Sequence, residues 1–167
     1  MEDERRSFIG AGEGASVYVG GLWAVHKLFG EDTNGAFSVV EHPVEPGVLA
    51  APPHTHERED EFSIVVEGEI GVWMDGEEFA AGPGDYVIKP CGAPHAFWNA
   101  GPGKARLIEI ISPPGFEKYF DEMADLVYST DGEPDFEEAV ELGEKYGLTF
   151  HMEVVPELLE RHGLTFE

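Results

Sequence analysis

Three histidines and one glutamate in this sequence have the residue types and the spacing that can hold a metal ion. His54 and His56 form a His-x-His pair, Glu61 follows five residues later, and His95 comes from a separate segment. Residues two apart in a β-strand point to the same face and lie about 6–7 Å apart, so both imidazoles of the pair can reach one ion. Three imidazoles and one carboxylate leave coordination positions open for water, substrate or dioxygen. We therefore predict that His54, His56, Glu61 and His95 bind one divalent first-row ion, namely Fe, Mn, Ni, Co, Cu or Zn.

The segments that carry these four residues read as strands separated by turns. Two prolines just before the histidine pair disfavour a helix there, and a run rich in β-branched residues at 62–66 predicts a strand that Glu61 opens. Clusters of glycine and proline at 82–85 and 90–94 mark turns. The second cluster ends directly before the last of the histidines, which is therefore expected to open a strand as well.

Two longer patterns contain the candidate ligands. Residues 47–68 read G-(x6)-H-x-H-(x4)-E-(x6)-G, and residues 84–99 read G-(x5)-P-x-G-(x2)-H-(x3)-N. Together they resemble the two motifs of the cupin family, with one residue more than usual between Gly47 and His54. The resemblance covers about residues 15–115 and is closest to small single-domain cupins of the quercetin-dioxygenase-like type. It implies an all-β fold, a jelly-roll β-barrel.

The rest of the pattern agrees with a barrel followed by a different kind of structure. We expect a leader at 1–14, a cupin β-barrel at 15–112 and a C-terminal helical extension at 113–167, because the apolar period changes from two to 3.6 after a Ser-Pro-Pro-Gly segment. A loop is expected at 30–35, and it ends in an Asn-Gly pair of the kind favoured in tight hairpins. Strands are expected at 15–21, 22–29, 36–40, 62–66, 69–74, 77–80, 86–89, 95–99 and 105–111, and helices beginning near 116, 134 and 156.

The extension contains one repeated segment, Gly-Leu-Thr-Phe, at 147–150 and again at 163–166. Each glycine is typical of a helix C-terminal cap in the left-handed region. Two interpretations are open: the repeat reflects shared capping chemistry alone, or the two segments are short strands that pair within the extension or across a dimer.

The charge of the chain excludes several classes of partner. With 34 acidic and 10 basic residues, the formal net charge is −24, so nucleic acid and anionic membranes would be repelled. The acidic residues are either a solvated surface or an adaptation to a salty cytoplasm. No apolar run approaches 18 residues, the first residues are charged, and the one cysteine, Cys91, forbids an internal disulfide. These features predict a cytoplasmic protein in which Cys91 is structural.

The family resemblance also suggests a reaction. In quercetin-dioxygenase-like cupins the matching glutamate both binds the metal and accepts a substrate proton, so Glu61 is the candidate catalytic base. The expected function is a metal-dependent dioxygenase or oxidoreductase that acts on a small enolic or phenolic compound. Phe97 shares the face of His95 by strand alternation and is either a wall of the substrate pocket or ordinary barrel core.

Two other classes of function remain open. One is a non-redox isomerase, decarboxylase or hydrolase that uses the metal as a Lewis acid, and the other is a cupin that binds a small molecule without turning it over. The resemblance further implies a homodimer. Asn99, at the end of the second motif, is expected to support a turn. Four further histidines match no ligand pattern and are expected to be structural or surface residues: His26, His42, His151 and His162.

Overall fold

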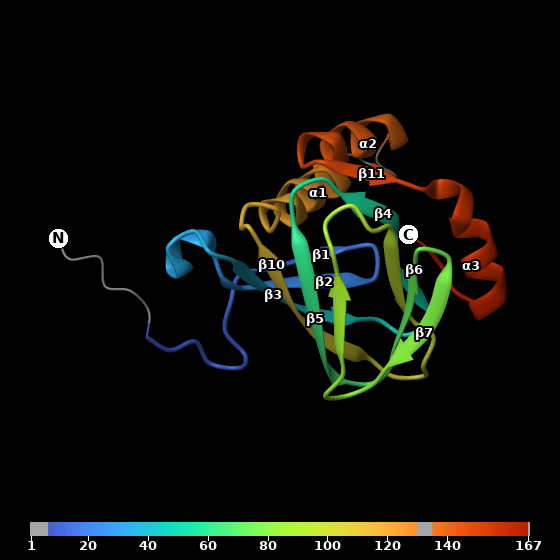
Figure 1. Ribbon diagram of the computed structural model, residues 1–167, viewed down its shortest axis with the longest axis horizontal. Helices are drawn as coiled ribbons and strands as arrows, with labels where there is room; N and C mark the ends of the chain where they lie inside the picture. Colours follow the sequence, from blue (N-terminus) through green and yellow to red (C-terminus); the bar gives the residue numbers. More distant parts are fainter. Residues whose placement is uncertain (1–6, 130–134, 167) are drawn as a thin grey trace.

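The computed structural model describes residues 7–129 and 135–166, and consists mainly of two antiparallel β-sheets with helices above and to one side (Figure 1). The strands are β1 (Ser16–Val19), β2 (Leu22–Leu28), β3 (Ser38–Val44), β4 (Val48–His56), β5 (Asp60–Glu67), β6 (Ile70–Met74), β7 (Glu77–Ala81), β8 (Tyr86–Lys89), β9 (His95–Asn99), β10 (Ala105–Ser112) and β11 (Leu148–Phe150). The helices are α1 (Lys118–Ser129), α2 (Phe136–Lys145) and α3 (Val155–His162), with short 3-10 turns η1 (Gly30–Thr33) and η2 (Met152–Val154).

The core lies between the two sheets. One sheet has the strand order β1-β2-β3-β10-β5-β8, and the other has the order β11-β4-β9-β6-β7. Along β3 and β10 every second side chain is buried, which is the period-two pattern of a strand with one face on a core. The all-β jelly roll predicted from the sequence is confirmed. Among the described residues, no helix is both long and apolar enough to cross a membrane.

The connection between β2 and β3 contains the loop predicted at 30–35, but its Asn-Gly pair does not form a tight two-residue hairpin. Residues 30–33 form the turn η1, and Asn34 follows in the left-handed region with φ 56°. The carboxylate of Asp32 accepts the backbone N–H of Phe29 at 2.9 Å, and the Thr33 hydroxyl accepts the N–H of Phe37 at 3.1 Å. These side-chain bonds stabilise a longer loop, so β3 begins at Ser38 rather than at residue 36.

The repeated Gly-Leu-Thr-Phe segments do not pair with each other. The first forms β11, which is antiparallel to β4, and the second meets β4 in a parallel bridge between Val48 and Thr165. Both glycines have positive φ, 76° and 64°, as expected of residues that end helices. The interpretation that the two segments pair with each other within the extension is therefore wrong, because both of them bond to the backbone of β4 instead.

Candidate metal centre

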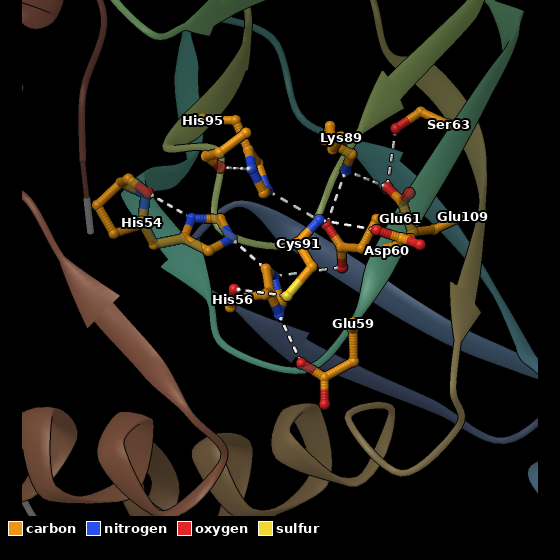
Figure 2. A network of polar contacts seen from close by, with 12 residues as sticks. His54, His56, Glu59, Asp60, Glu61, Ser63, Lys89, Cys91, His95 and Glu109 are labelled. Atoms are coloured by element: carbon orange, nitrogen blue, oxygen red, sulfur yellow. Dashed lines mark hydrogen bonds and ion pairs between the residues drawn. The ribbon is translucent and has the colours of Figure 1, made fainter.

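The four predicted ligands come from three strands and meet at one point. His54 and His56 lie on β4, Glu61 is the second residue of β5, and His95 begins β9. The nitrogen and oxygen atoms that could bind a metal all lie within 4.8 Å of one another, and all four residues are buried. His54 Nε2 is 3.2 Å from His56 Nε2, and Glu61 approaches His56 Nε2 at 3.5 Å and His95 Nε2 at 3.2 Å (Figure 2). The two sequence motifs are thus brought together as predicted.

The other ring nitrogen of each histidine is held by a hydrogen bond that fixes its tautomer. His54 Nδ1 donates to the carbonyl of Pro52 at 2.7 Å, and His95 Nδ1 donates to the carbonyl of Ala93 at 3.0 Å. A carbonyl oxygen can only accept, so in both rings the proton is on Nδ1. His56 Nδ1 faces the carboxylate of Glu59 at 3.2 Å, which sets the same tautomer. In the neutral form of each ring, Nε2 then carries no proton, and its lone pair points towards the other candidate ligands.

This arrangement lacks a positive charge at its centre. Three lone pairs and the Glu61 carboxylate face one another, and His95 Nε2 is buried with no hydrogen-bond partner among the residues that the structure describes. Burial lowers the pKa of His54 well below its usual value, with further lowering by His95 and His56, and burial also lowers the pKa of His95. Neutral imidazoles are the form that binds a metal. The donor set and its protonation therefore fit a divalent first-row ion.

A buried lysine, which the sequence analysis did not single out, lies beside the cluster. Lys89 Nζ is 3.0 Å from Glu61 Oε2 and 2.7 Å from Glu109 Oε2, and Ser63 Oγ donates to the same oxygen of Glu109 at 2.9 Å (Figure 2). Although burial alone would raise it, Lys89 and the neighbouring histidines hold the pKa of Glu61 well below its usual value. Burial raises the pKa of Glu109 to about 7, and within the described part of the chain its Oε1 is buried and has no hydrogen-bond partner.

The sequence contains one indication of the buried pair formed by Lys89 and Glu109. Along β10 the inward positions are otherwise apolar, and Glu109 occupies one of them. A charged residue at an inward position of an alternating strand needs a buried partner. The partner could not be named from the sequence because Lys89 lies on β8, which does not neighbour β10: β5 lies between them.

Comparison with known proteins agrees with this geometry. Residues 40–111 match the family model described as a cupin domain. These residues form a cupin domain. Quercetin 2,3-dioxygenase from Bacillus subtilis is similar to this cupin, with 26% identity over 117 residues, which is 69% of this chain and 34% of that enzyme. The chain thus spans about a third of the length of that relative.

Solved structures of other cupins resemble it over most of the barrel. An RmlC-like cupin from Shewanella frigidimarina is 27% identical with a TM-score of 0.56, covering 65% of this chain and 91% of that one. A sugar phosphate isomerase of the cupin superfamily from Silicibacter pomeroyi is 26% identical with a TM-score of 0.50, covering 59% of this chain and 69% of that one. Proteins with differing activities therefore share this fold, and the activity has to be argued from the site.

Aromatic side chains from the C-terminal extension lie against the cluster of candidate metal ligands. The ring of Phe116 meets that of His56 edge-on with centroids 4.5 Å apart, and Phe150 of β11 lies 6.5 Å from His54. Tyr119 stacks on Phe116 at 5.1 Å. Burial raises the pKa of Tyr119, so its hydroxyl stays protonated. The extension thus forms an aromatic wall beside two of the candidate ligands, which sequence periodicity could not show.

Phe97 and Asn99 lie on β9 beyond His95. Phe97 is buried in the barrel core, with its ring centroid 6.5 Å from that of His42 and 5.4 Å from Lys89 Nζ. Asn99 donates to the carbonyls of Val44 and Gly103. It therefore supports a turn, as predicted.

The remaining histidines and the cysteine lie outside the cluster. Each of the four histidines has a hydrogen-bond partner: Asp121 for His26, the Trp23 carbonyl for His42, Thr55 for His151 and Glu78 for His162. Cys91 is exposed, and its backbone N–H donates to Asp60 at 2.8 Å. These residues have structural contacts, in agreement with their expected roles.

Proposed function

We propose that this cupin is a metal-dependent dioxygenase that acts on a small enolic or phenolic compound. The observation that carries the proposal is the set of three histidines whose Nδ1 atoms are fixed as donors and whose Nε2 atoms meet the Glu61 carboxylate. The similarity to Quercetin 2,3-dioxygenase from Bacillus subtilis supports the choice of reaction class. The metal and the substrate are the parts of the proposal that experiment has to identify.

The chain's own residues would share the work as follows. His54, His56 and His95 hold the ion, and Glu59 and two backbone carbonyls orient their rings. A redox-active ion held there would supply coordination positions for substrate and dioxygen. Glu61 is kept ionised by Lys89, so it can bind the ion and can accept a proton from a hydroxyl that is itself acidic, as in a conjugated enol or phenol.

Metal content and oxygen uptake test this proposal. Protein purified without a tag or chelator is expected to hold about one equivalent of Fe, Mn, Ni, Co or Cu per chain, and His54→Ala is expected to lose it. His162→Ala is the matched control, because His162 contacts Glu78 away from the cluster. The metal-loaded wild type should consume oxygen with a flavonol or a β-diketone. A wild type that binds no metal after reconstitution would contradict the proposal.

A second candidate is a non-redox isomerase of the same site. The similarity to the sugar phosphate isomerase from Silicibacter pomeroyi favours it, because that comparison also covers most of the barrel. A Lewis-acid reaction would run equally well under nitrogen and with Zn. Turnover without oxygen uptake selects this candidate, whereas substrate binding without turnover would indicate a non-catalytic binding protein.

A further inference from the structure

The strand that carries His54 and His56 is paired differently along its length. Its pairing with β9 shifts register twice and ends at His54, which lies opposite His95, the first residue of β9. Thr55 and His56 lie beyond that point, and in the part of the chain that the structure describes the strand that pairs with them is β11. The carbonyl of His56 also accepts the N–H of Gly92 at 2.9 Å. The ligand-bearing end of β4 therefore depends on β11 for its strand pairing.

Each of these two ligands has a residue of β11 as its neighbour across the strands. The register pairs His56 with Leu148, Thr55 with Thr149, and His54 with Phe150. A backbone hydrogen bond closes the pairing at each end, from Glu57 N–H to the Gly147 carbonyl at 2.9 Å and from His151 N–H to the Pro53 carbonyl at 2.8 Å. If β11 left the sheet, the backbone that carries both imidazoles would lose these partners.

The helices of the extension pack behind β11 (Figure 1). Leu148 is 4% exposed and belongs to the barrel core. A Cβ atom at Gly143 of α2 would lie 2.5 Å from the ring of Phe150, so α2 lies directly on β11. Tyr146, which follows α2, donates its hydroxyl to Glu122 of α1 at 2.6 Å. Because of these contacts, β11 is part of one packed unit with α1 and α2.

The second Gly-Leu-Thr-Phe segment docks at the other end of the same strand. Thr165 N–H donates to the Gly47 carbonyl at 2.8 Å, and Leu49 N–H donates to the Thr165 carbonyl at 2.8 Å. Leu164 of this copy is 7% exposed and lies in the small apolar cluster that contains Leu49 and Trp98. The two copies of one tetrapeptide thus hold the two ends of β4, and the first copy is the one that lies beside the candidate ligands.

We propose that β11 is a positioning element of the metal centre: docking of Leu148–Phe150 on β4 holds His54 and His56 in the geometry that binds an ion. A segment attached by a few backbone bonds opens more readily than a core strand, so this geometry is lost whenever β11 opens. A bound ion in turn favours the docked segment, because a coupling between two equilibria acts equally in both directions. The inference rests on the metal centre of the proposed function and not on the reaction assigned to it.

Matched substitutions in the two copies of the repeat test the effect of β11 on metal affinity. Leu148→Ala and Leu164→Ala remove the same atoms from two buried leucines, one at each end of β4. Calorimetric titration of the metal-free full chain with Zn²⁺ measures each dissociation constant, and thermal melting checks that each variant is folded. Leu148→Ala should raise the dissociation constant by about tenfold or more, Leu164→Ala should leave it within about twofold, and Leu148→Met should stay within about threefold of wild type.

Hydrogen exchange of the unaltered chain tests the reverse effect and does not depend on the folding of a destabilised variant. Zn²⁺ is expected to slow amide exchange at residues 148–151 by about fivefold or more, and to change exchange at residues 163–166 by less than about twofold. In His54→Ala, which removes a candidate ligand, Zn²⁺ should slow neither segment.

Several results would overturn the proposal. Equal weakening of Zn²⁺ binding by Leu148→Ala and Leu164→Ala, or no weakening by either, would show that β11 has no special role, and so would equal protection of the two segments in hydrogen exchange. A wild type that binds no Zn²⁺ would overturn the proposal together with the metal centre. Zn²⁺ binding that depends on Leu148, in a protein that consumes no oxygen with any redox-active metal, would support the proposal and contradict the dioxygenase reaction alone.

Discussion

Lys89 lies next to a carboxylate that the proposed metal ion also needs. Its ammonium is buried between Glu61 and Glu109, and these two carboxylates raise the lysine's pKa although burial by itself would lower it. A divalent ion bound to Glu61 would meet a positive charge already in contact with its ligand. Lys89 therefore stabilises the metal-free site, and its ammonium would compete with a metal ion for the Glu61 carboxylate.

Because of this competition, removing the lysine charge should destabilise the metal-free protein and strengthen metal binding. In Lys89→Met the two carboxylates lose their buried partner, so the metal-free protein is expected to lose about 3–5 kcal/mol of stability. Added Co²⁺ or Zn²⁺ should then raise the melting temperature more than it does in wild type, because the ion no longer competes with the ammonium. Differential scanning fluorimetry with and without metal measures both. Lys145→Met, at an exposed pair with Glu122, is the control, and an unchanged metal-free melting temperature in Lys89→Met would contradict the prediction.

Glu109 is expected to make the stability of the metal-free protein depend on pH. Burial raises its pKa to about 7 in the folded state, so the folded protein holds a proton that the unfolded chain releases near the ordinary glutamate pKa of 4.5. The stabilisation is therefore complete below about pH 4.5 and is lost as pH rises towards 7 and above, on the order of 3 kcal/mol in all. The side chain in Glu109→Gln has no proton to lose in this range. The melting temperature of the variant should therefore rise relative to that of wild type as pH increases from 4.5 to 8. A constant difference between the two across that range would count against this account.

At the scale of elements, the second repeat of Gly-Leu-Thr-Phe fixes α3 to the barrel. Leu49 N–H donates to the carbonyl of Thr165 at 2.8 Å, and Leu164 is 7% exposed in a small apolar cluster with Trp98 and Leu158. Leu164→Ala is expected to cost about 2–3 kcal/mol, because it leaves a cavity in that cluster. Phe166→Ala, at a position 38% exposed, should cost less than about 1 kcal/mol. Urea unfolding followed by fluorescence compares the two, and equal losses would show that Leu164 has no special packing role.

The elements that the sequence predicted well are those whose pattern is local. The alternation in β10 and the turn clusters around β8 are visible in short windows, and the candidate ligands lie at or within two residues of strand ends. The pairing of β11 with β4 could not be predicted from local sequence patterns, because it depends on which strand edge remains free after the barrel closes. The pairing of Lys89 with Glu109 is hidden for the same reason, since it crosses strands far apart in the sequence.

At the scale of the whole molecule, the acidic excess is mostly unpaired. Among the residues that the structure describes, six basic side chains contact carboxylates: Lys27, Lys89, Lys104, Arg106, Lys145 and Arg161. The acidic residues outnumber them so strongly that most have no cation to pair with, and their mutual repulsion opposes the compact state.

Salt is therefore expected to stabilise the protein. Screening of the repulsion between low and molar KCl should raise the melting temperature, by roughly 2–4 °C for each kcal/mol of repulsion removed. Thermal melts in KCl measure this, with a parallel series in sucrose at matched osmolality to separate screening from solute exclusion. A melting temperature that stays level or falls with KCl would show that the surface charges are too far apart to destabilise the fold.

The edge of β4 also constrains the order in which the molecule can be assembled. Its partner on that edge, β11, and the bridge at Thr165 both come from the far part of the sequence, so β4 presents an open backbone edge while the chain is still emerging from the ribosome. His54 and His56 lie on that open strand. A nascent chain would thus expose two imidazoles on an open strand edge before the aromatic wall exists, so the edge of β4 is covered only once the C-terminal extension has been made.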